Sequence, residues 1–172
     1  MAKKVILAIA SNGYQEQEYN ETKKVLEDSG LEVVTVSDTD EMAIGHEGNQ
    51  AKVDIPTKNI NPALYSGMFI IGGPGALACL DNEKIHQALS EFFATQKPYG
   101  AICISPRILA KAQVLRGKNA TCWDGDGKTA EAFEIGNVTF ESGPVVVDGK
   151  IVTADGPDAA QEFGKAIVNL IK

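Results

Sequence analysis

The sequence predicts an α/β protein built on a doubly wound, mostly parallel sheet, with helices on both faces and an appended β-hairpin. Three observations predict this class. The runs 5–10 and 68–71 are entirely apolar, as expected of strands buried on both faces of a parallel sheet. Such runs alternate along the chain with stretches of helical periodicity. Near the end, Asp148-Gly149 separates two β-rich runs and is a strong signal for a hairpin turn.

The first half of the chain predicts strand–helix alternation. The expected strands are 5–10, 31–36, a half-exposed edge strand at 51–55, and 68–71. The expected helices are 16–29, which ends at Gly30, a short one at 62–65, and 82–95. The polar segment 38–48 contains glycines and is expected to be a loop.

The second half is expected to complete the sheet. A buried strand at 99–102 follows Lys97-Pro98, and a helix begins at Pro106 and continues to Leu115. Short strands are expected at 120–123 and 138–140, the hairpin at 145–153, and a closing amphipathic helix at 158–172.

Length and composition favour one domain, 1–172, in the cytoplasm. A net charge of -7 argues against nucleic-acid binding, and no stretch is long enough to span a membrane. Three cysteines without a C-x-x-C pair suit a reducing compartment. With only two histidines, His46 and His86, no metal site is expected. The run 72–75 loosely resembles a dinucleotide fingerprint but lacks the acidic residue about 20 positions later, so no cofactor is expected.

Cys103 lies where the expected strand 99–102 turns sharply into the next helix, the position at which α/β hydrolases carry their nucleophile. Ser105 is expected to cap that helix in front of Pro106. The helix dipole would favour the thiolate and lower the pKa of Cys103 from about 8.5 to about 5.5. The alternative is an inert, buried cysteine that fills the strand end.

Three segments that follow strands are expected to meet at the carboxyl edge of the sheet, namely 12–18, 72–75 and 103–105. Gly72 and Gly73 could let the backbone approach the sulfur, and the N–H groups of Gly73 and Ile104 would then form an oxyanion hole. The simpler interpretation of these glycines is a tight turn.

Glu16 and Glu18 lie in the first turn of a helix, where carboxylates are favoured by the helix dipole. This explanation suffices for Glu16. Glu18 is different if it faces the Cys103 thiolate, because its pKa would then be raised and it would donate a proton to the sulfur.

Together these residues resemble a known family. Ala101-Ile102-Cys103-x-x-Pro106, Gly72-Gly73 and Glu18 resemble the ThiJ/PfpI (DJ-one) superfamily, which includes intracellular protease I and shares the class I glutamine amidotransferase-like fold. Further matches are Lys52-Val53-Asp54, 153–157 and Glu162-Phe163. The resemblance implies a flavodoxin-like core, a homodimer or higher oligomer, and a reactive cysteine beside a protonated glutamate. By position these carry onto Cys103 and Glu18, with Gly73 and Ile104 as oxyanion donors.

The chain departs from the family pattern at three positions. Ile104 stands where protease-like members have histidine, Ser105 where many have glycine, and Trp123 where others supply a histidine. His46 is expected in a loop and His86 on a helix surface, so neither replaces the missing base. Losing a general base costs about 10²–10⁴ in rate, which argues against peptidase activity.

Two function classes remain. In the first, Cys103 adds to a small electrophile while Glu18 shuttles the proton, giving hydrolase, hydratase or glyoxalase-like chemistry. In the second, the protein is a non-catalytic redox or stress sensor in which an oxidant converts Cys103 to a sulfinate that Glu18 stabilises. Trp123 would wall the pocket or fill the core. Cys79 and Cys122 are expected to be buried structural residues, with a resolving role as the alternative.

Overall fold

The apolar strands assemble into one seven-stranded sheet in the computed structural model, which describes residues 1–172. The strand order is β11-β12-β8-β7-β1-β3-β6. The bounds are β1 Lys4–Ala8, β3 Glu32–Ser37, β6 Ile55–Pro56, β7 Gly67–Ile70, β8 Tyr99–Ile102, β11 Val145–Asp148 and β12 Ile151–Ala154. Every neighbouring pair is parallel except the hairpin pair of β11 and β12. The predicted α/β class is therefore confirmed.

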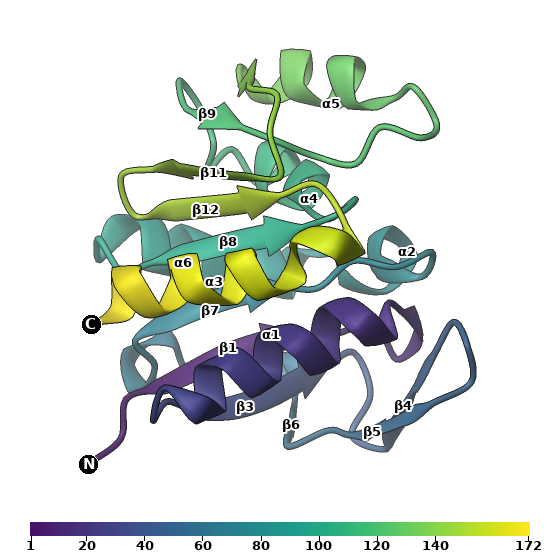
Figure 1. The fold of residues 1–172 in the computed structure, drawn as a ribbon, viewed down its shortest axis with the longest axis vertical. Helices are drawn as coiled ribbons and strands as arrows, with labels where there is room; N and C mark the ends of the chain where they lie inside the picture. The colour runs from purple at the N-terminus through teal and green to yellow at the C-terminus, as the bar shows by residue number, and fades with distance from the viewer.

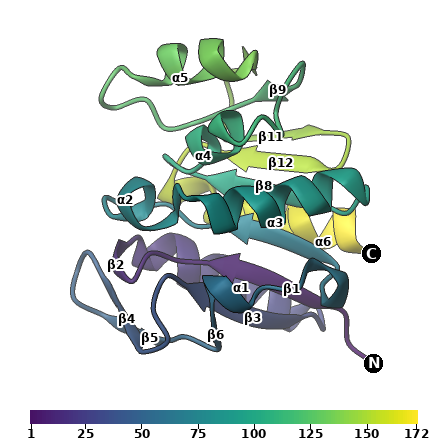
Figure 2. The same ribbon diagram turned by 180° about the vertical axis from the view of Figure 1, so that it is seen from behind.

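Helices cover both faces of this sheet (Figures 1 and 2). One face carries α1 (Glu16–Asp28) and α6 (Ala160–Ile171), and the other carries α3 (Glu83–Ala94) and α4 (Pro106–Lys111). Each face of the sheet has its own hydrophobic core, and alternate residues of β1 pack into one or the other. Val5 and Leu7 pack with α1 and α6, and Ile6 and Ala8 pack with α3 and α4. Because both sets are fully buried, the strand is apolar throughout.

A second, three-stranded sheet lies beyond the carboxyl ends of the central strands (Figure 1). It consists of β2 (Asn12–Tyr14), β4 (Met42–Gly45) and β5 (Gln50–Lys52). The prediction of a loop over 38–48 was wrong for residues 42–45, because β4 pairs in parallel with β2. The single edge strand expected at 51–55 is instead divided between two sheets. Its start lies in β5 of this second sheet, and its end lies in β6 of the main sheet.

The C-terminal half differs from expectation at its edges. The predicted hairpin is continuous with the main sheet, since β12 pairs with β8. The helix after the elbow ends at Lys111, before Gln113, whose φ of 63° lies in the left-handed region.

Two helices were not predicted, α2 (Ala76–Leu80) and α5 (Thr129–Gly136). The remaining elements are β9 Asn119–Ala120, β10 Thr139–Phe140, and 3₁₀ turns at Thr57–Asn59, Pro62–Leu64 and Pro157–Ala159. No helix combines the length and apolarity that crossing a bilayer requires.

Candidate active site

Cys103 occupies a sharp turn between β8 and α4, with a φ of 64°. A left-handed conformation costs a residue with a Cβ about 1–2 kcal/mol, so its neighbours must hold it in place. Its N–H donates to the Ala154 carbonyl at 2.9 Å, and its carbonyl accepts from the Trp123 N–H at 2.8 Å. The structure thus places Cys103 on the elbow expected from the sequence.

Ser105 does not cap α4, contrary to the prediction. Its backbone is already helical, and no side-chain capping bond is formed. The hydroxyl instead donates to the Ile71 carbonyl at 2.8 Å. The side chain therefore ties the start of α4 to the end of β7, one strand away from Cys103.

Glu18 is completely buried beside the elbow. Its Oε2 accepts from the Gly72 N–H at 2.8 Å, while Oε1 has no hydrogen bond of regular geometry. Burial raises the pKa of Glu18 to about 7, against the opposing effects of the Gly72 N–H and the Cys103 thiol. A carboxyl of this kind is protonated in a large share of molecules near neutral pH.

Gly72 creates the space in which Cys103 and Glu18 meet. A Cβ on this residue would lie 2.5 Å from the Cys103 Cβ and 2.8 Å from Glu18 Oε2. The requirement for glycine is therefore a close approach of three segments and not a turn conformation. Gly73 differs, because its φ of 119° itself favours glycine.

The expected fall in the pKa of Cys103 is not found. Burial, followed by the neighbouring Glu18 carboxyl, raises the pKa of the thiol, and the N–H groups of Ile104 and Gly73 only partly oppose this. The helix behind the elbow has six residues, so its dipole is a weak counterweight. Two adjacent anions in a buried site are disfavoured, so the thiol and the carboxyl titrate as a pair in which ionisation of one group raises the pKa of the other.

Cys103 opens into a pocket of about 360 Å³. The lining residues are Gln15, His46, Gly73, Pro74, Cys103, Ile104, Trp123 and Pro157. Trp123 is 38% exposed and forms a wall of this pocket, so it is not a core residue. Gly73 and Ile104 both interact with the sulfur through their N–H groups, neither of which donates to another acceptor in the chain.

Arg107 organises the loop that carries Trp123. The guanidinium is 7% exposed and binds both carboxylate oxygens of Asp126, at 2.6 and 2.9 Å. It also donates to the Trp123 carbonyl at 3.1 Å and to the Thr129 hydroxyl at 3.1 Å. This charge holds the pKa of Asp126 well below its usual range. The pocket wall is therefore anchored by a residue of α4.

The other two cysteines have neighbours other than the Cys103 sulfur. Cys122 is buried, and its sulfur lies 3.3 Å from the Cys103 carbonyl oxygen. Cys79 is half-buried beside the Ser11 hydroxyl, 3.7 Å away. The burial of Cys122 suits the structural role expected for it, whereas Cys79, expected to be buried, is only half-buried.

His46 lies in a turn after β4, as expected of a loop residue, but it also lines the pocket, which the sequence did not indicate. Its N–H donates to the Tyr14 carbonyl at 3.0 Å, and Nε2 lies 3.5 Å from Oε2 of Glu16. Glu16 is only 3% exposed, so the helix dipole does not suffice to explain it. No local pattern indicates this contact, because it depends on the pairing of β2 with β4.

The fold and the elbow define an α/β protein with a cysteine at the nucleophile position above a parallel sheet. Residues 3–170 match the model of the DJ-1/PfpI family, and the chain belongs to this family. The resemblance noted in the sequence is thereby confirmed.

Three relatives illustrate the similarity. A protein of Methanocaldococcus jannaschii is 35% identical over 170 residues, which cover 98% of this chain and 82% of that protein. A ThiJ/PfpI domain protein from Brachyspira murdochii superimposes with a TM-score of 0.90 at 27% identity, covering 99% of this chain and 96% of the other. Toxoplasma gondii DJ-1 in an oxidized form gives a TM-score of 0.83 at 26% identity, over 99% and 91% of the chains.

Proposed function

We propose that this protein is a cysteine-dependent enzyme that acts on small carbonyl electrophiles, through hydrolase, hydratase or glyoxalase-like chemistry. One observation supports the proposal: the buried carboxyl of Glu18 lies beside Cys103, which opens into a pocket for small molecules, and we infer that the two groups share a proton. The only backbone donor to the Glu18 carboxyl is the Gly72 N–H, which binds Oε2, so the buried Oε1 is the oxygen available to the sulfur.

The reaction begins in the protonation state in which Glu18 holds the shared proton and Cys103 is the thiolate. The sulfur attacks the carbonyl carbon, a carbon–sulfur bond forms, and the π electron pair passes to the oxygen. The N–H groups of Gly73 and Ile104, which otherwise serve the sulfur, are the donors available to this oxyanion. Their preorganisation favours the charged adduct over the neutral substrate.

Substrate size follows from the pocket. A volume of about 360 Å³ is at the small end of ligand sites and is walled by Trp123. Ile104 also replaces the histidine that protease-like relatives carry after the cysteine. These features favour small molecules over peptides.

Turnover of methylglyoxal and simple esters tests the proposal. Cys103→Ser should lower the rate at least about 10³-fold, because a serine without a strong base is a far weaker nucleophile. Equal rates in the two proteins would refute the enzyme hypothesis. Glu18→Leu should change the pH dependence of Cys103 alkylation, and an unchanged profile would refute the shared proton.

A second candidate, a redox sensor, is favoured by the same pocket. Cys103 is accessible to small oxidants, and a protonated Glu18 could donate a hydrogen bond to a sulfinate. A related protein, the DJ-1 of Toxoplasma gondii, has been solved in an oxidized form. Under mild peroxide the intact mass should stop at two added oxygens on Cys103, and uptake of none or three would contradict this role.

Homodimerisation or a higher assembly is a further expectation from the family. Sedimentation of the purified protein would test it, and a monomer at micromolar concentration would contradict it.

A further inference from the structure

We infer that His46, held by the buried carboxylate of Glu16, is a catalytic residue that donates a proton to the oxygen of the carbonyl attacked by Cys103. This inference rests on the proposed function and extends it. It supplies an imidazole to a pocket whose elbow has isoleucine in the position next to the cysteine.

Glu16 is the first part of the argument. The side chain is only 4% exposed, and Oε1 accepts from the Glu47 N–H at 2.8 Å. The second oxygen, Oε2, is buried and has no hydrogen-bond partner. A buried carboxylate with one unpaired oxygen is costly unless a cation lies beside it.

His46 is the group beside that oxygen. Its Nε2 lies 3.5 Å from Oε2 of Glu16 and 3.9 Å from the exposed carboxylate of Glu47. Two acidic side chains therefore face the same ring nitrogen. The ring is about one-third exposed and lines the pocket that contains Cys103.

The backbone around the pair is built to hold it. Gly45 precedes His46, and a Cβ at Gly45 would collide with the carboxylate of Glu16. The antiparallel strands β4 and β5 form a hairpin that contains His46 in its turn. The pairing of β2 with β4 and the bond from the His46 backbone N–H to the Tyr14 carbonyl fix this hairpin above the start of α1. The same first turn of α1 carries Glu18, so one helical turn orients both acids of the site.

The proton transfer completes the addition step. As the sulfur bonds to carbon, the oxygen gains the π electron pair and takes a proton from the His46 imidazolium, leaving a neutral ring and a neutral adduct. When an ester adduct collapses, His46 takes the proton back as the carbonyl reforms, the bond to the alkoxide breaks, and the alkoxide leaves with the proton held by Glu18. A thioester then remains on Cys103. Water hydrolyses it to the acid, the thiolate is released, and the remaining proton returns to Glu18, so atoms and charge balance.

The two histidines of the chain provide a matched pair of variants. His46→Ala should lower kcat for methylglyoxal or ester turnover about 10²-fold or more with little change in KM, since general acids contribute about 10²–10⁴. His86→Ala should match the wild type. Added imidazole should restore part of the His46→Ala rate, because the deletion opens space in the pocket, and should not affect Cys103→Ser.

Loss of His46 could lower turnover either because a proton donor is missing or because the elbow is distorted. Alkylation of Cys103 by iodoacetamide distinguishes these two roles of His46. This reaction needs the thiolate but no proton donor for a carbonyl oxygen. His46→Ala should therefore alkylate within about twofold of the wild-type rate. A large fall in alkylation would mean that His46 maintains the elbow, and would overturn the proton-donor role.

Glu16 acts through His46 and is a positioning residue. Glu16→Gln should lower kcat about 10-fold, while the double variant Glu16→Gln/His46→Ala should be no slower than His46→Ala alone. Multiplicative losses in the double variant would assign Glu16 a separate structural role and overturn the coupling.

The outcomes distinguish this inference from the function on which it depends. If Cys103→Ser retains the full rate, the proposed enzyme function fails. If Cys103→Ser is inactive but His46→Ala turns over at the wild-type rate, or lacks imidazole rescue, only the role of His46 fails.

Discussion

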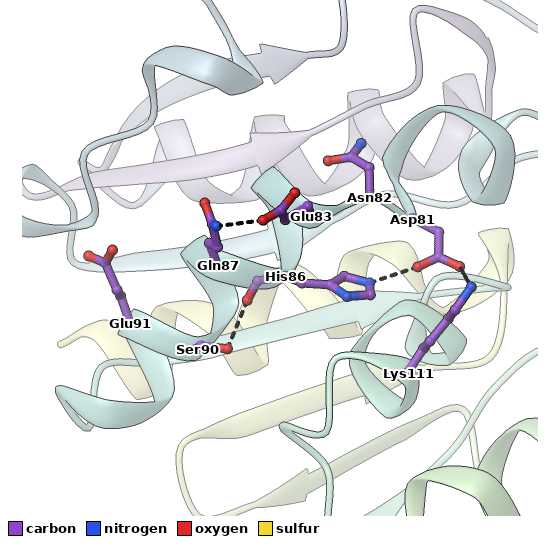
Figure 3. Close-up of a pocket in the computed structure, with 8 residues that line it drawn as sticks. All are labelled: Asp81, Asn82, Glu83, His86, Gln87, Ser90, Glu91 and Lys111. Atoms are coloured by element: carbon purple, nitrogen blue, oxygen red, sulfur yellow. Dashed lines mark hydrogen bonds and ion pairs between the residues drawn. The ribbon is translucent and has the colours of Figure 1, made fainter.

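The protein contains two histidine–carboxylate pairs in opposite surroundings. His86 Nε2 lies 2.7 Å from Asp81 Oδ1, and the second oxygen of Asp81 binds Lys111 at 2.9 Å (Figure 3). His46 and Glu16 are farther apart, at 3.5 Å. By distance alone, the pair of His86 and Asp81 is the stronger one.

The surroundings of the two pairs favour the His46 pair for chemistry, although its contact is longer. The groove around His86 is larger, about 680 Å³, but only polar side chains line it, and the hydroxyl of Ser90 is engaged with the His86 carbonyl. The pocket around His46 holds Cys103 and an apolar wall formed by Trp123. A histidine–carboxylate pair becomes chemically useful through a neighbouring nucleophile and a desolvated pocket, not through a short contact.

The largest expected effect comes from filling the space between Cys103 and Glu18, which should remove the reactivity that distinguishes the pocket from the groove. Gly72→Ala places a methyl group where both side chains meet, and we expect alkylation of Cys103 and turnover to fall about 10²-fold. Ser90→Ala in the groove should leave both rates unchanged. A fully reactive Gly72→Ala protein would show that the elbow tolerates displacement.

Removing the guanidinium that anchors the pocket wall should give the next largest effect. Arg107→Ala leaves Asp126 without its partner and frees the Trp123 loop, so we expect a loss of about 2–3 kcal/mol in unfolding free energy. This is below the usual cost of breaking a fully buried pair because Asp126 is one-third exposed. Urea denaturation measures the loss, and a rise in KM should accompany it.

The raised pKa of Glu18 makes stability depend on pH. Between the ordinary pKa of 4.5 and about 7, the native state holds a proton that the unfolded state has lost, so the free energy of unfolding falls as pH rises. From pH 5 to pH 7.5, the wild type should lose about 2 kcal/mol more than Glu18→Gln.

Parallel urea titrations at the two pH values measure this difference. Glu83→Gln, at an exposed groove position, should follow the wild type. If Glu18→Gln also parallels the wild type, the carboxyl of Glu18 is already ionised at pH 5.

The smallest effect is expected in the groove itself. Lys111 is 66% exposed in its contact with Asp81, and exposed ion pairs contribute about 0–1 kcal/mol. Lys111→Ala should therefore change the unfolding free energy by less than about 1 kcal/mol and leave alkylation of Cys103 unaltered. A larger loss would mean that the ion pairs of the groove support the fold as strongly as those around the pocket.

The sequence alone determined the family, the sheet and the elbow. These depend on local signals: fully apolar strands, a proline at the start of a helix, and glycines at a strand end. Strand β8 was predicted with the bounds found, because a Lys-Pro turn and the elbow delimit it. The roles predicted for Cys103, Glu18, Gly73 and Ile104 stay predictions, but the structure does bring these residues together.

Only the tertiary structure decided which groups face one another and how they ionise. The raised pKa of Cys103 follows from burial against Glu18, a residue 85 positions away, and local helix-dipole reasoning gave the opposite sign. Likewise, the pairing of β2 with β4 brings His46 into the pocket. Burial and long-range contacts are properties of the packed chain, and no window of sequence around either residue contains them.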